Sequence, residues 1–366
     1  MELVRIESSM ALRSAAAAWD DLWQRSDVAL PLARAKLLAQ WLEHFGRSAR
    51  FVALTVRCGT RWLAALPLVE VRVAGCRPAG RMATSAWSSS GELLLDPTTA
   101  VEEVLDCLVA GLSELPWPVL WLDCVRGETP RWVALRAALA RAGLVANYRT
   151  QCHLGQIATD QDWPTYRAGW SRGHRRSIRR SARRLQAAGQ VTWQVFRDGP
   201  PAAVDGLLVR GFELEDRGWK GRAGTSVLRS PGILGFYLRQ ARQLAEWGHL
   251  ELLFLELDGQ PIAFEYGYSA KGVYFSHKVA YDEAYARFGP GQMLVYHQVA
   301  RCHADPTRQL IDSMGVLCPA MAKWTTHTTP MGRLVVGVDG ALGRLLVQGY
   351  AAFHGRFKRV ARSAAR

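Results

Sequence analysis

The chain has 366 residues, 49% of them hydrophobic and 21% charged, and its formal net charge is +14. This length predicts two domains with packed cores, and no apolar run approaches the ~20 residues of a membrane span. The N-terminal segment MELVRIESSM has no signal-peptide core, and the seven cysteines include no C-x-x-C pair. We therefore expect a cytoplasmic protein without a disulfide framework or a metal site.

The first half alternates predicted strands and helices. Apolar runs between turn residues predict the strands, and apolar residues at helical spacing predict the helices. In chain order these elements are a strand at 3–6, helices at 11–23 and 32–45, a hairpin of 50–56 and 61–71, a strand at 92–96, a helix at 99–112, a strand at 118–123 and a helix at 130–142. Residues 147–158 are expected to lead into the next helix.

The second half shows the same alternation more clearly. Tight turns at Asp258-Gly259 and Ala270-Lys271-Gly272 predict three consecutive antiparallel strands. The predicted elements are a strand at 191–196, helices at 202–215 and 233–247, strands at 250–257, 261–269 and 272–281, a helix at 292–303, a strand at 308–314, a short helix at 320–327 and a hairpin around Asp339-Gly340. We expect an α/β fold with domains at 1–147 and 148–350, followed by a basic, frayed tail at 351–366.

A run of arginines precedes these elements. Between Trp163 and Arg197 there are nine arginines and no acidic residue, and an apolar stripe predicts one helix over 163–189. The arginines form two rows at i, i+4 spacing, which are Arg172, Arg176, Arg180 and Arg184, and Arg175, Arg179 and Arg183. Like charges at this spacing destabilise a helix, so an anionic partner is expected. The alternative is a solvated basic face that docks by its apolar stripe.

Four segments resemble a known superfamily. They are GHRRSIRRSARRL, LEDRGWKGRAGTSVL, YDEAYARFGPGQML, and LIDSMG followed by AKW. In this order, with these strands and helices, the sequence resembles GNAT acyltransferases of the CelD-like branch, which is related to the Fem-type aminoacyltransferases. The resemblance implies tandem GNAT-like domains with a mixed sheet, of which the second is complete and the first is degenerate and lacks a donor site.

The glycine turn FGPGQ lies between a predicted strand and a helix. Glycines and a helix N-terminus suit phosphate, and in GNAT enzymes this turn holds the pyrophosphate of coenzyme A. The resemblance implies that Gly289, Gly291 and Gln292 bind acyl-CoA or acetyl-CoA, and that the Val279 region supplies a backbone N–H to the reacting carbonyl. Ala286 stands where the family pattern has Arg or Gln. A tRNA-borne donor and an ordinary helix start with proline therefore stay open.

Acyl transfer to an amine needs a base, an oxyanion donor and a proton for the leaving group. Glu265 and Asp312, which interrupt apolar strands, are the candidate bases, and His277 and Tyr281 are candidate proton relays. Each carboxylate has the alternative of pairing with an arginine. The candidate substrate-binding residues are Arg175, Arg176, Arg179, Trp219, Lys220, Asp282 and Lys323.

The expected function is N-acyl transfer from acyl-CoA to an amine of a small molecule or of a cell-envelope or exopolysaccharide precursor, such as one for cellulose. One alternative is a Fem-like transferase that uses aminoacyl-tRNA, the only nucleic acid expected as a partner. Another is a non-catalytic protein that binds nucleic acid or a membrane surface through the arginine helix. An acidic membrane surface at the inner face and a polysaccharide synthase complex are further expected partners.

Overall fold

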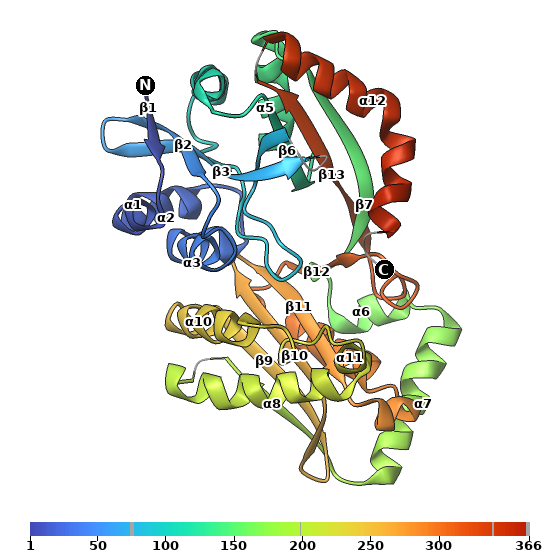
Figure 1. Cartoon of the computed structure of the whole chain (residues 1–366). Coiled ribbons are helices and arrows are strands. Elements are labelled where there is room, and N and C mark those ends of the chain that lie inside the picture. Colours follow the sequence, from blue (N-terminus) through green and yellow to red (C-terminus); the bar gives the residue numbers. More distant parts are fainter. Residues whose placement is uncertain (74–76, 198, 339, 364–366) are drawn as a thin grey trace. The chain divides into compact units, whose positions relative to one another are not determined.

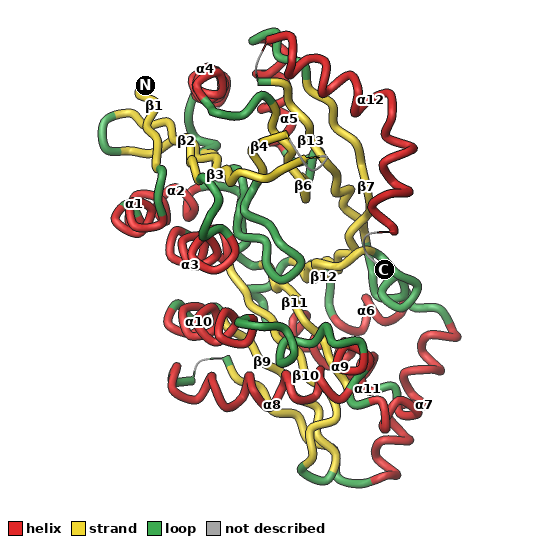
Figure 2. Tube along the Cα trace, in the orientation of Figure 1, coloured by secondary structure: helices red, strands yellow, loops and turns green. Residues whose placement is uncertain are grey.

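The computed structural model describes residues 1–73, 77–197, 199–338 and 340–363, and Figures 1 and 2 show the course of the chain. The chain divides into two compact units. The first comprises Met1–Val28, Leu32–Cys152 and Pro330–Arg366, and the second comprises Ala29–Pro31 and His153–Thr329. The C-terminal segment therefore belongs to the first unit, whereas the sequence predicted a single domain over 148–350.

The first unit is a mixed sheet with helices. Its elements are β1 (Glu2–Ile6), α1 (Ser9–Ser14), α2 (Ala16–Arg25), α3 (Ala35–Phe45), β2 (Phe51–Cys58), β3 (Arg61–Val73), β4 (Arg77–Arg81), β5 (Leu94–Leu95), α4 (Val101–Ala110), β6 (Val119–Val125), α5 (Pro130–Arg141), the first part of β7 (Ala146–Ala158), most of β13 (His327–Gly337) and α12 (Gly340–Ser363). The strand order is β1-β2-β3-β4-β6-β13-β7, and β5 pairs with β3. Strands β1 to β4 pair antiparallel, whereas β4 and β6 pair in parallel.

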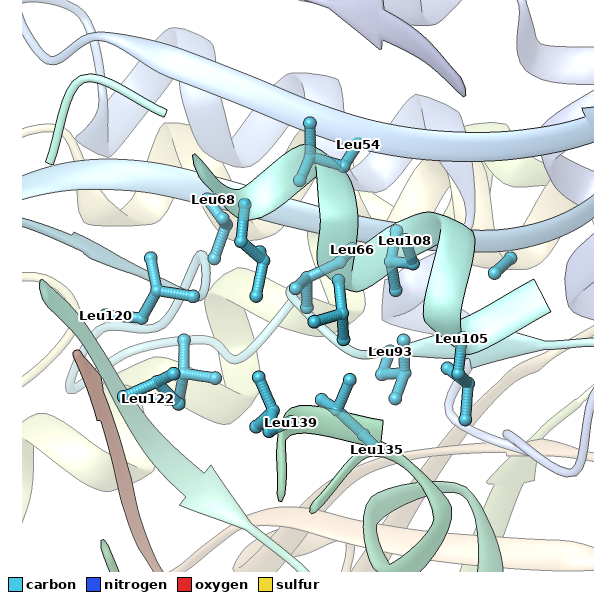
Figure 3. Packing of buried hydrophobic residues seen from close by; sticks show 14 of the residues in the cluster. Leu54, Leu66, Leu68, Leu93, Leu105, Leu108, Leu120, Leu122, Leu135 and Leu139 are labelled. Atoms are coloured by element: carbon cyan, nitrogen blue, oxygen red, sulfur yellow. The ribbon is translucent and has the colours of Figure 1, made fainter. Parts of the chain in front are cut away.

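Leucines make up much of the core of this unit. Figure 3 shows leucine side chains from α4, α5, β3 and β6 pointing toward one another. Leu105 and Leu108 of α4 and Leu135 and Leu139 of α5 are all at most 2% exposed. Each such buried side chain contributes about 1.5–3 kcal/mol to stability.

The C-terminal part of the chain differs from the prediction. Strand β13 pairs antiparallel with β6, with Gly337 opposite Val119. The predicted hairpin around Asp339-Gly340 is wrong, because Gly340 begins α12; Asp339 itself lies outside the described residues. The expected frayed tail is helical through Ser363. In the described ranges, no helix combines the length and apolarity that a membrane span requires.

The second unit has a six-stranded arrangement with helices. Its elements are the last part of β7, α6 (Trp163–Ala168), α7 (Arg172–Ala188), β8 (Val191–Phe196), α8 (Val204–Arg217), α9 (Trp219–Arg222), α10 (Ile233–Glu246), β9 (Leu250–Leu257), β10 (Gln260–Ala270), β11 (Val273–Tyr281), the 3₁₀ helix η4 (Glu283–Phe288), α11 (Pro290–Ala304) and β12 (Leu310–Val316). The strand order is β7-β12-β11-β10-β9-β8. Strands β8 to β11 pair antiparallel, and β11 and β12 pair in parallel.

These elements confirm the predicted α/β class and the order of strands and helices over 191–316. Two predictions for strands and helices of this unit outside 163–189 are wrong. Residues 319–324 form turns in place of the short helix predicted at 320–327. Residues 147–158, expected to lead into the next helix, belong to the strand β7. The pairing of β7 with β12 explains the second error, since a partner distant in sequence stabilises this strand.

The predicted arginine helix over 163–189 is two helices. The Asp162 side chain accepts a hydrogen bond from the Thr165 N–H at 2.7 Å and caps α6. The Ser171 hydroxyl accepts one from the His174 N–H at 3.1 Å and caps α7. A serine at this position satisfies a free N–H of a helix start, so the arginine rows begin a new helix at Arg172.

Helix α8 packs closely on this sheet at Gly211 but not at Gly206. A Cβ on Gly211 would lie 2.4 Å from Cζ of Phe264 in β10, whereas a Cβ on Gly206 of the same helix would meet nothing within 4 Å. We expect Gly211→Ala to lower the free energy of unfolding by about 1–3 kcal/mol through overpacking. We expect Gly206→Ala to raise it by roughly 0.5–1 kcal/mol, because alanine favours a helix over glycine. Urea unfolding of both variants checks this, and equal effects would contradict the packing.

Candidate active site

A β-bulge in β11 sets the geometry of the site. Tyr266 of β10 pairs with Lys278, and the next residue, Gly267, pairs with Ser276, so His277 is the extra residue. An extra residue breaks the alternation of side chains along a strand. His277 and Lys278 consequently both face α10: the imidazole Nε2 lies 3.2 Å from Oη of Tyr237, and the ammonium lies 5.4 Å from the centre of the Tyr237 ring.

The His277 ring lies between two tyrosines. Its Nε2 faces the Tyr237 hydroxyl, and its Nδ1 lies 3.4 Å from the Tyr268 hydroxyl. Burial raises the pKa of both phenols well above the usual value, so both hydroxyls keep their protons at neutral pH. The tyrosines can therefore orient the imidazole and pass protons, but they do not act as bases.

A buried carboxylate and two lysines adjoin this histidine. Glu215 of α8 is 4% exposed, and its Oε1 lies 2.6 Å from Nζ of Lys220 and 3.7 Å from Nζ of Lys278. Its Oε2 accepts a hydrogen bond from the Val227 N–H at 2.9 Å. Burial lowers the pKa of Lys278 to about 8, although Glu215 opposes this shift. The sequence placed Glu215 beside Trp219 and Lys220 in one segment but did not select Lys278, because only the bulge and the tertiary fold bring this lysine to the carboxylate.

Asp312 lies on the same face of the sheet. It pairs in register with Phe275 of β11, which in turn pairs with Tyr268 of β10. Asp312 is fully buried, and its two oxygens accept hydrogen bonds from Nε2 of Gln156 at 3.0 Å and from the Met314 N–H at 2.8 Å. The ladder between β11 and β12 ends at Phe275 and Asp312, although both strands continue.

The structure separates the four candidate catalytic residues into two pairs. His277 and Asp312 share the face toward α10. Glu265 lies on the opposite face, where Tyr274 and Ser276 donate hydrogen bonds to its carboxylate. Tyr281 also turns that way, since a Cβ on Gly291 of α11 would lie 3.4 Å from its ring. Burial raises the pKa of Glu265 to about 7.

One small pocket gathers several of the predicted residues. Trp219, Lys220, Val279 and Tyr281 line it together with Glu215 and Glu283. Trp219, Val279 and Tyr281 are 61%, 37% and 41% exposed, so apolar surface is open at this mouth. Glu283 holds the α9 segment in place by accepting hydrogen bonds from the Trp219 N–H at 2.9 Å and from Arg222 at 2.7 Å.

Asp282 has a mainly structural environment. Its carboxylate accepts a hydrogen bond from the Ala284 N–H at 3.0 Å, which caps η4, and lies 3.3 Å from Arg217. It is therefore placed at the end of β11, next to the pocket-lining Tyr281, with its own side chain engaged locally.

The glycine turn offers few free backbone donors. Gly289 adopts the left-handed conformation, with φ of 65°, and Pro290, which has no N–H, is the first residue of α11. The N–H groups of Gln292 and Met293 donate to the Gly289 carbonyl at 3.0 and 3.1 Å. The Gln292 side chain accepts a hydrogen bond from Trp324 Nε1 at 3.0 Å. Phosphates at this turn thus need charge from another source.

The basic candidates lie mostly on α7. Arg176 and Arg179 are exposed, and Arg175 donates to the Ala168 carbonyl at 2.9 Å. Lys323 is exposed. Burial of His174 lowers the pKa of this histidine, and the charge of Lys323 lowers it further. The ion pairs found within the described ranges involve none of the seven arginines of α7, which are Arg172, Arg175, Arg176, Arg179, Arg180, Arg183 and Arg184.

Residues 172–316 match the family described as acetyltransferase (GNAT) domain. This match covers α7 through β12 and supports N-acyl transfer as the general class of reaction. It also makes acyl-CoA the expected co-substrate class, since GNAT domains use acyl-CoA. No curated protein matches the chain. The finer CelD-like assignment stays a prediction.

Several solved structures share the fold over most of the chain. A crystal structure of FemX superposes with a TM-score of 0.60 at 11% identity and covers 92% of this chain and 97% of that one. The C-terminal domain of a putative lysylphosphatidylglycerol synthetase from Agrobacterium fabrum gives 0.54 at 12% identity, with 93% and 97% covered. A conserved protein of unknown function from Bacteroides thetaiotaomicron gives 0.53 at 13%, with 92% and 100% covered. These likenesses show a shared fold.

Glu265 makes the stability of the protein depend on pH. The folded state holds its proton up to about pH 7, whereas the usual pKa is 4.5, so the folded state binds more protons between these values. Raising the pH through this window therefore destabilises the wild type, by about 3 kcal/mol in total. We expect the stability of Glu265→Gln relative to wild type to rise across the same window. Urea unfolding of both proteins from pH 4 to 8 checks this, and a flat difference would contradict it.

Asp312→Asn places an amide where both carboxylate oxygens now accept hydrogen bonds. The amide NH₂ group of the asparagine then faces one of the two donors, so one hydrogen bond is lost. We expect the free energy of unfolding to fall by about 1–3 kcal/mol. The exposed Asp160 serves as the control, and Asp160→Asn should change stability by less than about 0.5 kcal/mol. Thermal unfolding of both variants measures the effect. Equal melting temperatures would show that Asp312 does not hold β7 and β12 together.

Proposed function

We propose that the second unit is an N-acyltransferase that moves an acyl group from acyl-CoA to an amine. The observation that carries this proposal is the bulged strand β11, which ends its ladder with β12 after three residue pairs and leads through η4 into the glycine turn. Around this strand, one face presents a histidine held by two tyrosines, and the other presents the turn and Tyr281. Acyl transfer requires the amine to reach the carbonyl carbon of a bound thioester while the thiolate leaves away from the amine, and two differently equipped faces of one strand suit this arrangement.

The chemistry divides between the two faces. On the α10 face, His277 accepts a proton from the amine as nitrogen attacks the thioester carbonyl, while the hydroxyls of Tyr237 and Tyr268 orient the imidazole. The carbonyl oxygen faces the backbone of β11 at Val279, whose N–H stabilises the oxyanion. The C–S bond then breaks, and Tyr281, beside Gly291, donates a proton to the thiolate. Glu265 lies away from the amine, and we assign it no proton transfer.

The pocket beside β11 suits a polar acceptor. Trp219 offers an exposed ring, Lys220 and Lys278 share the carboxylate of Glu215, and α9 carries Trp219 and Lys220 on a short segment tied to Glu283. An aromatic platform beside one lysine and two carboxylates fits an amine substrate that also bears sugar hydroxyls. This supports a small molecule or an envelope or exopolysaccharide precursor as acceptor.

One observation favours aminoacyl-tRNA as a second candidate donor. The glycine turn has Ala286 at the position of the usual Arg or Gln, and two of its N–H groups are used within the helix. The fold likeness to FemX is consistent with this candidate but does not carry it. In either case the acyl carbon would react at the same bulged strand.

The decisive experiment measures transfer from acetyl-CoA to a panel of amino acids, amino sugars and polyamines, with products detected by mass spectrometry. We expect His277→Gln to lower kcat by 10²–10⁴-fold, the usual contribution of a general base. The exposed His153 provides the control, and His153→Gln should retain wild-type turnover. Full activity in His277→Gln would remove this histidine from the mechanism. Salt-sensitive RNA binding without any transfer would support a non-catalytic protein instead.

A further inference from the structure

Helix α7 lies directly against the glycine turn. The Ser181 hydroxyl lies 3.0 Å from the position that a Cβ on Gly289 would take, and Arg184 donates a hydrogen bond to the Arg287 carbonyl at 3.3 Å. Figure 1 shows α7 running alongside the segment that precedes α11, and α7 contacts both η4 and α11. The guanidinium groups of this helix therefore add positive charge near the turn, beside that of the exposed Arg287.

Helix geometry tells the two arginine rows apart. Successive residues are rotated by about 100° around a helix axis. Measured from Ser181, Arg184 lies about 60° and Arg180 about 100° away on the side of the turn, and Arg176 lies about 140° away on that side. The buried residues His174, Ile178 and Leu185 lie on the opposite side of Ser181. Arg175 and Arg179 follow beyond them in that direction, at about 120° and 160° from Ser181. Arg180 and Arg184 of the first row therefore border the turn, Arg176 follows one helical turn further away on the same side, and Arg175 and Arg179 lie beyond the buried residues on the other side.

The turn has few free N–H groups for binding phosphate, and the arginine row can supply positive charge in their place. Pro290 has no N–H, the N–H groups of Gln292 and Met293 bind the Gly289 carbonyl, and Ala286 carries no charge. Meanwhile the seven arginines of α7 line one surface hollow, and no carboxylate of the described chain pairs with them. Repulsion within the rows costs helix stability, so the arrangement suits a ligand that brings several negative charges.

We propose that Arg176, Arg180 and Arg184 bind the phosphates of the nucleotide part of the acyl donor and so replace the backbone grip of a glycine-rich phosphate turn. This inference rests on the proposed function. It assigns the phosphates to guanidinium forks, which bind phosphate oxygens bidentately. It also makes donor affinity steeply dependent on salt, because three exposed side chains supply the charge.

The test compares two double variants that remove the same charge. Arg180→Gln with Arg184→Gln changes the row beside the turn, and Arg172→Gln with Arg183→Gln changes exposed arginines about 160–180° away from Ser181. Calorimetry with coenzyme A, and separately with adenosine 3′,5′-bisphosphate, gives the dissociation constants. We expect the first variant to raise both constants at least tenfold, about 1.4 kcal/mol. The second should stay within about threefold of wild type, because distant exposed charges are screened.

A donor without phosphates supplies the matching control. Turnover of the acetyl thioester of N-acetylcysteamine should be equal in wild type and in the Arg180→Gln, Arg184→Gln variant. The melting temperature of this variant should stay the same or rise, because repulsion in the row is relieved. Since Arg184 also bonds the turn, the single variant Arg180→Gln is measured as well, and it should weaken coenzyme A binding without any change in fold.

The outcomes separate the two proposals. If wild type binds coenzyme A and transfers its acyl group, but the Arg180→Gln, Arg184→Gln variant binds it equally well, the arginine row is not the phosphate site and the proposed function stands. Equal weakening by both double variants would mean that only net charge matters, and it would overturn the assignment to this row. If wild type neither binds coenzyme A nor uses acyl-CoA, both the inference and the proposed donor fail.

Discussion

The extra residue at His277 in β11 is the constraint on which the site depends. Side chains alternate between the two faces of a strand, so one inserted residue reverses the assignment of everything that follows it. Without the bulge, Lys278 would face α11, and Val279 and Tyr281 would face α10. With it, histidine and lysine share one face, Tyr281 meets the glycine turn on the other, and β11 continues past the end of its ladder with β12.

Within its described residues, the second unit has buried charges that are paired and exposed charges that are not. Inside the site, Glu215 holds Lys220 and Lys278 at short distances, and burial shifts the pKa of Lys278 to about 8. A buried charge needs a partner, because desolvation otherwise costs several kcal/mol. On α7, by contrast, the arginines remain in solvent, where repulsion costs only tenths of a kcal/mol for each pair. The first arrangement positions groups for chemistry, and the second keeps a surface ready for an anion.

Fold and donor recognition are separate questions in this protein. The backbone superposes on structures with different names at 11–13% identity, and such likeness fixes the architecture but not the ligand. Recognition depends on which groups meet the donor: backbone N–H groups in a glycine-rich turn, or side chains brought from another element. Pro290 reduces the first contribution here and Ala286 offers no charged side chain, whereas the contact of Ser181 with the turn places the arginines of α7 close to it.

The sequence by itself determined the elements whose signals are local. Alternating apolar residues and tight turns predicted β8 to β12 in order. The resemblance selected Val279, and the chemistry of the residue types selected Trp219, Lys220 and Tyr281; all four line one pocket. Only the tertiary structure decided the pairing of β7 with β12 and of β13 with β6, because partners distant in the chain stabilise these strands. The same holds for the opposite faces of His277 and Glu265, for the meeting of Glu215 with Lys278, and for the arginine row that borders the turn. A bulge and a helix contact leave no periodic trace in the sequence, since each depends on the register between separate elements.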